Sequence, residues 1–175
     1  METTERTTPM RFQIFRATEA ECLEGGRASL VRPGSAGPPP EAVASLASVP
    51  DRGNFTRLVF AGGGMSLVYL WYKSGFMLPR HTHDTDCLYL VVAGGLRLGT
   101  ETLGPGDGFF VGKGVPYTYT AAEGGVEVLE FRAAEAFHTD LAAGTEFWGK
   151  LVSQMRERQE QWAEEADPPS FLRFS

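Results

Sequence analysis

The sequence is poor in cysteine, in clustered basic residues and in long apolar runs, and each absence excludes a class of protein. Its 175 residues include only two cysteines, Cys22 and Cys87, so no disulfide framework is expected and the cytoplasm is the expected location. Lys and Arg number 16 against 22 Asp and Glu, which argues against a nucleic-acid partner. No run approaches the roughly 18 apolar residues of a membrane span, and the first ten residues carry no apolar signal segment. Neither a membrane partner nor export is therefore expected.

Short apolar segments dominate the middle of the chain, and they predict an all-β domain. Between Phe55 and Arg132, segments rich in Val, Leu, Phe and Tyr are separated every few residues by Gly, Pro or Asp. Strands this short, with turns this frequent, are typical of a sandwich or barrel of antiparallel hairpins. A chain of 175 residues is long enough for one core and too short for two ordinary domains. We therefore expect one domain, with its barrel at residues 55–135.

The two ends of the chain differ from this segment. Residues 1–54 are expected to form an extension, with an edge strand at 11–16 and then a loop rich in Pro and Gly with one helical turn at 41–48. Residues 136–175 are expected to form a helix and a tail. Apolar residues recur at helical spacing over 145–166, which predicts an amphipathic helix packed across the barrel or forming a dimer seam.

The triplet His81-Thr82-His83 is the first candidate site. Side chains on a strand alternate between its faces, so both imidazoles are expected to point the same way. Two neutral imidazoles about 7 Å apart along the backbone can bind one divalent ion. Such a pair alone does not establish a metal site, because many are hydrogen-bonded polar residues at the rim of a sheet.

The flanks of this triplet resemble the first motif of the cupin superfamily. Gly75, His81, His83 and Gly94 stand at the spacing of that motif, and Cys87 stands where the family has Glu. The resemblance covers about residues 65–132.

The segment LGPGDGFFVGKGVPYTYT, residues 103–120, resembles the second cupin motif. Gly106 and Gly114 keep their places, and Gly112 stands where Pro is usual. Tyr117 replaces the customary His, and Ala121 replaces the customary Asn.

The resemblance implies a double-stranded β-helix, the cupin jelly-roll barrel, with a site at its mouth where the two motifs converge. An N-terminal strand and loop extension and a C-terminal amphipathic helix would flank the barrel. The family commonly holds iron, manganese, nickel or zinc with three His and one Glu. This sequence keeps only two of those four ligands in kind, His81 and His83.

Further side chains are candidates to complete the coordination. The thiolate of Cys87 could bind the ion, although a free cysteine is equally a small buried apolar residue. Tyr117 could bind a metal once ionised, or act with Tyr119 as a general acid. Asp86 would complete a set of two histidines and one carboxylate, but it needs a bulge to reach the ion. His138 lies beyond the last expected strand and is expected at the surface.

Two functional hypotheses follow from these residues. The first is a metal-dependent cupin enzyme, an oxygenase, isomerase, cyclase or lyase, that acts on a small organic molecule with a divalent Zn, Fe, Mn or Ni ion held by His81 and His83. The second is a metal-free cupin that binds a small-molecule ligand or performs acid–base chemistry. Buried imidazoles without partners cost about 1–3 kcal/mol each, which favours the first. A homodimer is expected because exposed strand edges invite pairing and because Trp148 and Trp162 need cover.

Overall fold

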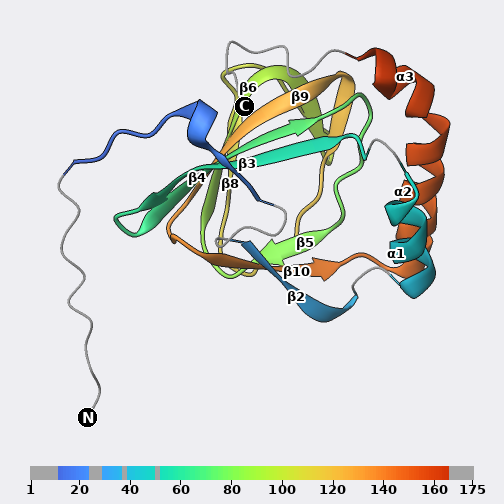
Figure 1. The fold of residues 1–175 in the computed structure, drawn as a ribbon, viewed down its shortest axis with the longest axis horizontal. Helices are drawn as coiled ribbons and strands as arrows, with labels where there is room; N and C mark the ends of the chain where they lie inside the picture. The colour runs from blue at the N-terminus through green and yellow to red at the C-terminus, as the bar shows by residue number, and fades with distance from the viewer. Residues whose placement is uncertain (1–11, 24–28, 37–38, 50–51, 166–175) are drawn as a thin grey trace.

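The computed structural model describes residues 12–23, 29–36, 39–49 and 52–165, and it folds them into strands with three helices at one end (Figure 1). The strands are β1 (Glu21–Cys22), β2 (Ser29–Ala36), β3 (Asn54–Gly62), β4 (Met65–Tyr72), β5 (His81–His83), β6 (Cys87–Leu98), β7 (Glu101–Leu103), β8 (Gly108–Val111), β9 (Thr120–Arg132) and β10 (Phe137–Ala142). The helical segments are a 3₁₀ turn (Ala17–Glu19), α1 (Pro40–Ala47), α2 (Thr145–Glu157) and α3 (Gln159–Glu164).

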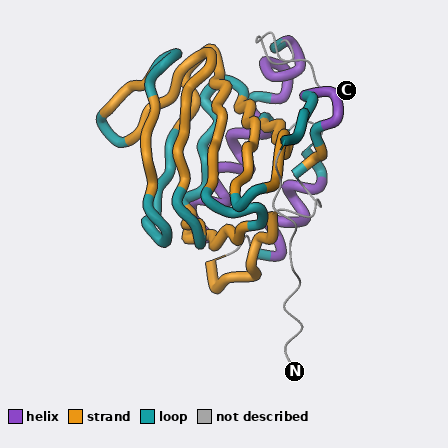
Figure 2. Tube along the Cα trace, turned by 90° about the vertical axis from the view of Figure 1, so that its left-hand side faces the viewer, coloured by secondary structure: helices purple, strands orange, loops and turns teal. Residues whose placement is uncertain are grey.

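The strands form two sheets that enclose the interior of the domain. The larger sheet has the order β1-β3-β4-β9-β6-β7, with β8 paired to β6, and its neighbours are antiparallel. The smaller sheet has the order β2-β10-β5 and lies against the larger one (Figures 1 and 2). The predicted all-β barrel is confirmed.

Strand β6 shows how the sequence directs one face of a strand inward. Cys87, Tyr89 and Val91 are buried, whereas Leu88 and Leu90 between them are exposed. This alternation is the period of two that a pleated strand imposes. The expectation that Cys87 shares an inward face with Tyr89 and Val91 is confirmed.

The main chains of the two motifs pair with each other. His81 N–H donates to the carbonyl of Tyr117, and Tyr117 N–H donates to the carbonyl of His81, both at 3.1 Å. The same antiparallel ladder continues from Leu78 N–H to the carbonyl of Tyr119, at 3.0 Å. Backbone hydrogen bonds therefore hold residues 81 and 117 side by side.

Two glycines of the first motif are required by their backbone. Gly75 has φ +64° and Gly94 has φ +68°, a region that residues with a Cβ rarely adopt. A Cβ at Gly94 would also collide with the carbonyl oxygen of Gly125, where β6 and β9 approach each other.

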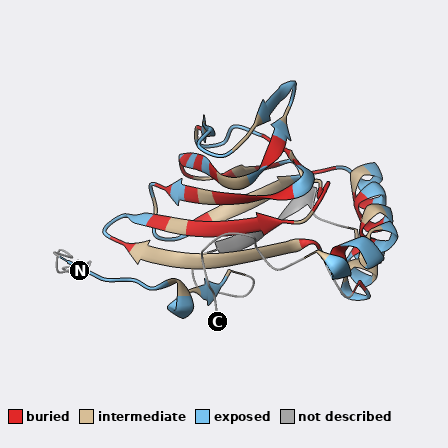
Figure 3. Ribbon diagram, turned by 90° about the horizontal axis from the view of Figure 1, so that it is seen from above, coloured by how far each residue is buried: buried red, intermediate tan, exposed pale blue. Residues whose placement is uncertain are grey.

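The predicted amphipathic helix at 145–166 is present, but as the two helices α2 and α3, which meet at Arg158. Its apolar face packs on the end of the barrel, where the ring of Trp162 lies 6.3 Å from that of Phe76 (Figure 3). Trp148 and Trp162 are only 4% and 0% exposed. The expectation that these tryptophans need a second chain to cover them was therefore wrong, because the barrel covers them.

Three sequence expectations differ from the structure. The edge strand expected at 11–16 is absent from the described residues 12–16, and β1 pairs with the edge of β3 instead. The expected loop contains the end of β2, although its helical turn is confirmed as α1. The second sheet uses β2 and β10, both outside the expected barrel range of 55–135. Alternation alone did not reveal these strands, because their partners lie far away in the sequence.

Within the described residues no helix is long and apolar enough to cross a membrane.

Candidate metal centre

A cavity of about 150 Å³ lies between the two sheets, and we call it the interior cavity. Its walls come from both sheets, because β4, β6 and β9 line one side and β5 and β10 line the other. One end of it is polar and is formed by His81, His83, Tyr117, Glu130 and Arg132. Apolar side chains, including Leu70, Leu78, Phe137 and Leu141, form most of the remaining wall.

The two histidines converge on one atom. Each is 6% exposed, and their Nε2 atoms lie 2.7 Å (His81) and 3.2 Å (His83) from the hydroxyl oxygen of Tyr117. The expectation that both imidazoles and this phenol meet in a single cavity is confirmed. Their roles in metal binding and in acid–base catalysis remain predictions.

The other ring nitrogens fix how the imidazoles are oriented. Nδ1 of His81 lies 2.7 Å from the carbonyl of Pro79, which can only accept, so this nitrogen carries the proton and Nε2 keeps its lone pair. Nδ1 of His83 lies 3.1 Å from the hydroxyl of Thr139 and 3.4 Å from the carbonyl of His138. Contacts at Nδ1 thus fix the orientation of both rings, and each Nε2 points into the interior cavity.

Burial keeps both imidazoles neutral. Loss of solvent, with a smaller contribution from the charge of Arg132, lowers the pKa of His81 to about 4 and that of His83 to about 3. A neutral imidazole has a free lone pair, which is the form that binds metal ions. At neutral pH the pair is therefore ready to act as two ligands.

A chain of polar groups continues from the histidines across the larger sheet. The hydroxyl of Tyr89 contacts that of Tyr117 and donates to Oε1 of Glu130. Oε1 of Glu130 lies 3.7 Å from Nε2 of His83, and Oε2 lies 2.6 Å from Nη2 of Arg132. Burial raises the pKa of Tyr89 and Tyr117 well above the usual value, so both phenols stay protonated at neutral pH. Burial also raises the pKa of Glu130, against the opposing effect of Arg132.

These groups hold more lone pairs than hydrogens. Four contacts join them: Tyr117 to each histidine, Tyr117 to Tyr89, and Tyr89 to Glu130. When Glu130 is ionised, the two phenols supply two hydrogens for these four contacts. His83 can supply a third hydrogen from Nε2, but Nδ1 of the same ring then carries none. A cation that accepts lone pairs would satisfy such a set, so the donors fit a divalent metal ion.

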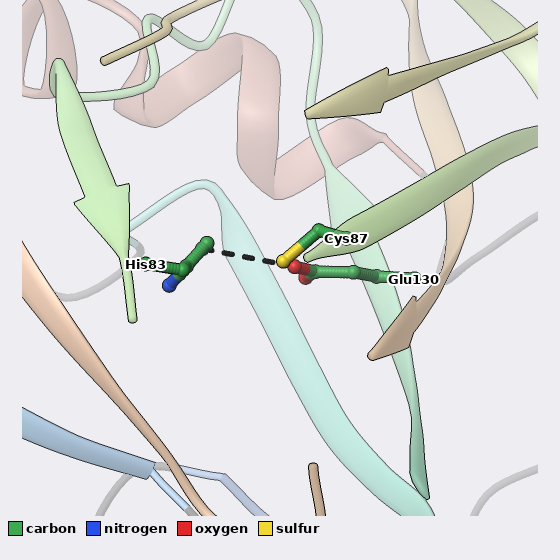
Figure 4. A group of neighbouring side chains, drawn as sticks. All are labelled: His83, Cys87 and Glu130. Atoms are coloured by element: carbon green, nitrogen blue, oxygen red, sulfur yellow. Dashed lines mark ion pairs between the residues drawn. The ribbon is translucent and has the colours of Figure 1, made fainter. Parts of the chain in front are cut away.

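Cys87 adds a sulfur to the same space. Ligand atoms of His83, Cys87 and Glu130 all lie within 4.8 Å of one another (Figure 4). Burial raises the pKa of Cys87 to about 12, and the nearby Glu130 carboxylate raises it too. The thiol is therefore protonated at neutral pH, and it could ligate an ion only if the ion displaced its proton.

Glu130 and Arg132 were not predicted as site residues from the sequence. The β6–β9 register sets Tyr89 opposite Glu130 and Cys87 opposite Arg132, so a carboxylate enters this space from the strand beside Cys87. The signal was present in VEVLEFR, since Val126, Val128, Glu130 and Arg132 alternate along one buried face of β9. Two charged residues that continue an inward apolar series indicate a buried ion pair.

The structure does not bring Asp86 to the histidines. Asp86 is exposed, and its Oδ1 accepts a hydrogen bond from the backbone N–H of Lys113 at 2.8 Å. Its neighbours Thr85 and Cys87 are both buried, so the side chain of Asp86 points to the opposite, outward side of the chain. The proposed ligand role of Asp86 is therefore corrected, and Glu130 supplies the carboxylate near His83.

Tyr119 and His138 lie near the site without joining the polar chain. Tyr119 lines the interior cavity, and its ring packs edge-on against Tyr72 and Phe109, with centroids 5.9 and 6.0 Å away. His138 lies on β10 and is partly buried, so its expected place at the surface was wrong. Its carbonyl faces Nδ1 of His83 because β10 pairs with β5.

No family model and no curated protein sequence matches the chain. Solved structures do match parts of it. A variant of oxalate decarboxylase from Bacillus subtilis matches with a TM-score of 0.45 and 20% identity over 49% of this chain and 26% of that chain. KdgF from Halomonas sp. matches with a TM-score of 0.43 and 23% identity over 47% of this chain and 82% of that chain.

An RmlC-like cupin from Shewanella frigidimarina matches with a TM-score of 0.43 and 22% identity, over 49% of this chain and 80% of that chain. The match to oxalate decarboxylase spans about a quarter of that protein, so its activity is not carried over. In this chain the two motifs pair through their main chains inside a barrel of two sheets. The fold is therefore the β-barrel that the resemblance to the cupin motifs implies.

Proposed function

We propose that the protein is a cupin metalloenzyme that binds a divalent ion with His81, His83 and Glu130, and that acts on a small organic molecule in the interior cavity. The observation that carries this proposal is the convergence of two neutral imidazole lone pairs and a carboxylate on the hydroxyl chain of Tyr117 and Tyr89. When bound, the ion would polarise a carbonyl group or bind dioxygen.

The donor set favours some ions over others. Two imidazoles with one carboxylate suit iron or manganese, whereas the thiol of Cys87 with imidazole would suit zinc. Glu130 takes the carboxylate role that the sequence analysis gave to Asp86. The raised pKa of Cys87 makes the sulfur the less available donor at neutral pH. Tyr117 remains a candidate further ligand, because its oxygen lies close to both Nε2 atoms.

The residues of the chain would hold and move a proton beside the ion. Tyr117 is protonated at neutral pH and lies at the polar end of the interior cavity, so its hydroxyl can donate to an oxygen of the substrate. Tyr89 links that hydroxyl to Oε1 of Glu130, which can return the proton. Oxygenase, isomerase, cyclase and lyase reactions all remain open, because the fold does not choose among them.

A second function is supported by the same hydroxyl chain. A metal-free cupin could bind its ligand, or perform acid–base chemistry, with Tyr117 and the two imidazoles alone. The continuous contacts from His81 through Tyr117 and Tyr89 to Glu130 favour this alternative, because they need no ion to exist.

Metal analysis of the purified protein separates the two functions. Protein purified without added metal is analysed by mass spectrometry for Mn, Fe, Ni and Zn, beside the His81→Ala/His83→Ala double variant and a Tyr119→Phe control. We expect close to one ion per chain in the parent and in the control, and none in the double variant. Only trace metal in the parent after incubation with each of the four ions would overturn the metalloenzyme proposal and leave the metal-free one.

We also propose that the protein is a cytoplasmic homodimer. Apolar side chains are exposed on the outer side of β6, β8 and β9, where Leu88, Phe110 and Phe131 are 50%, 64% and 42% exposed. Exposed apolar patches of this kind are typical of interfaces between chains.

A further inference from the structure

A short apolar segment before β1 has little cover, and we call its residues 12–16 the N-terminal arm. These residues belong to no helix or strand, and they lead outward from the barrel (Figure 1). Phe12 and Ile14 are 84% and 61% exposed, and Phe15 is 48% exposed. Large apolar side chains that gather on a surface are typical of a contact with a second molecule. The arm is therefore a candidate for such a contact.

One side chain of the arm contacts the larger sheet. The ring of Phe15 lies 5.4 Å from that of Phe60 on β3. Both side chains line an apolar groove of about 620 Å³, which we call the outer groove. Its other large apolar walls come from β4, β6, β8 and β9, and they are Met65, Leu67, Leu88, Phe110 and Phe131. The groove thus begins where the arm leaves the barrel.

The outer groove is separate from the imidazoles of the candidate metal centre. Its walls on β6, β8 and β9 lie on the outer side of the sheet, because side chains of a strand alternate between two faces. Phe131, for example, is exposed between the buried Glu130 and Arg132. His81 and His83 line the interior cavity and not the outer groove. A chain that occupied the groove would therefore leave both imidazoles untouched.

The exposed apolar area is large enough for a dimer interface. A phenylalanine side chain buries roughly 200 Å² when it is fully covered. At that value the exposed parts of four phenylalanines amount to about 480 Å² per chain, and these are Phe12, Phe15, Phe110 and Phe131. A standard interface buries about 800 Å² on each partner. Four aromatic side chains of the arm and the groove alone would thus supply more than half of that area.

A second copy of the chain is the occupant that these features fit. Every copy carries both an apolar arm and an apolar groove, so two copies related by a twofold axis can exchange arms and fill both grooves. Phe12 and Ile14 alternate with Gln13, which is the pattern of an extended segment buried on one side. Within the described part of one chain that segment is unpaired, and its apolar side chains stay exposed.

We propose that the N-terminal arm of each chain packs into the outer groove of a second copy, where Phe12 and Ile14 of one chain contact Phe110 of the other. This inference rests on the homodimer proposed above, and it names the segment of the second chain that covers the exposed apolar side of β6, β8 and β9.

Photocrosslinking in the full chain tests whether the arm contacts a second copy. Phe12 is replaced by the photoreactive p-benzoylphenylalanine, and the product is reassembled with heavy-isotope-labelled chain of the native sequence. After irradiation we expect a light peptide that contains residue 12 to be joined to a heavy peptide from β6, β8 or β9. The same replacement of Val43 is the matched control. Val43 is exposed on α1, at the opposite end of the barrel, and should give no such product (Figure 1).

A charge substitution tests whether the arm holds the dimer together. Phe12→Glu removes an apolar contact from each of the two grooves, so the dissociation constant of the dimer should rise at least about a hundredfold in sedimentation equilibrium. Val43→Glu changes the net charge equally and should leave that constant unchanged. The circular dichroism spectrum of Phe12→Glu should match that of the parent, because Phe12 is not part of the core.

The outcomes separate the exchange of arms from the dimer itself. A monomeric parent protein would overturn both the homodimer and this inference. A dimeric parent that gives no product between light and heavy chains, or whose dissociation constant Phe12→Glu leaves unchanged, would overturn the inference and leave the homodimer standing. A product between light and heavy chains, together with a weaker dimer in Phe12→Glu, would support the inference.

Discussion

Replacement of Glu130 by Gln tests how much the buried ion pair contributes. Glu130 is 2% exposed, and its Oε2 lies 2.6 Å from Nη2 of Arg132. The amide keeps the shape of the side chain but leaves the guanidinium charge buried without a partner, which typically costs about 3–5 kcal/mol of unfolding free energy. For a chain of this size each kcal/mol lowers the melting temperature by about 2–4 °C, so we expect a loss of roughly 6–20 °C.

Glu127→Gln is the matched control, because Glu127 lies on the same strand and is 0% exposed. Its carboxylate accepts a hydrogen bond from the hydroxyl of Tyr69 at 2.9 Å, which an amide oxygen can also accept. We expect a cost of about 1 kcal/mol, measured like that of Glu130→Gln by urea unfolding at pH 7.5. Equal destabilisation by the two variants would refute the reasoning, since the pair with Arg132 would then contribute nothing of its own.

The remaining predictions concern pH, thiols and assembly. The folded-state pKa values of His81 and His83, about 4 and 3, lie below the usual 6.5, so the unfolded chain binds more protons between these values. The unfolding free energy should be highest above about pH 6.5 and should fall as the pH drops towards 4. Each unit of difference between the folded-state and unfolded-state pKa contributes about 1.4 kcal/mol. An unfolding free energy that does not change from pH 7.5 to 5 would contradict this. A disulfide reagent should modify one thiol in the native protein, the exposed Cys22, and two in denaturant, because Cys87 is buried; rapid modification of both in the native state would contradict it. Phe110→Glu should convert a homodimer to a monomer in light scattering after size exclusion, and a parent protein that is already monomeric would exclude the proposed dimer.

Local rules predicted part of the site. The shared inward direction of His81 and His83 follows from the alternation of a strand, and so does the burial of Cys87. The approach of Tyr117 to the imidazoles came from the resemblance to the second cupin motif, because no local pattern links residues 36 positions apart. The carboxylate could not be chosen locally, since the register of β6 against β9 decides that Glu130 and not Asp86 reaches this space.

The same distinction between local patterns and distant partners applies to the fold. Strands from 55 to 132 were predictable because turns separate apolar segments there, and the helices at 145–164 were predictable from their spacing. Strands β2 and β10 were missed, because a Pro and two Gly interrupt or flank one and polar residues occupy the other. Each is held by a partner across the smaller sheet, and single-strand patterns carry no information about such partners.

The paired main chains of His81 and Tyr117 make the third side chain of the site exchangeable. Because reciprocal amide-to-carbonyl bonds set the position of residue 117, its location does not depend on the phenol it carries. A Tyr117→His protein would present three imidazoles from an unchanged backbone, and only one base of a Tyr codon must change to encode it. The chemistry of this pocket can thus be altered by evolution or by design in a single step, while the scaffold stays as it is.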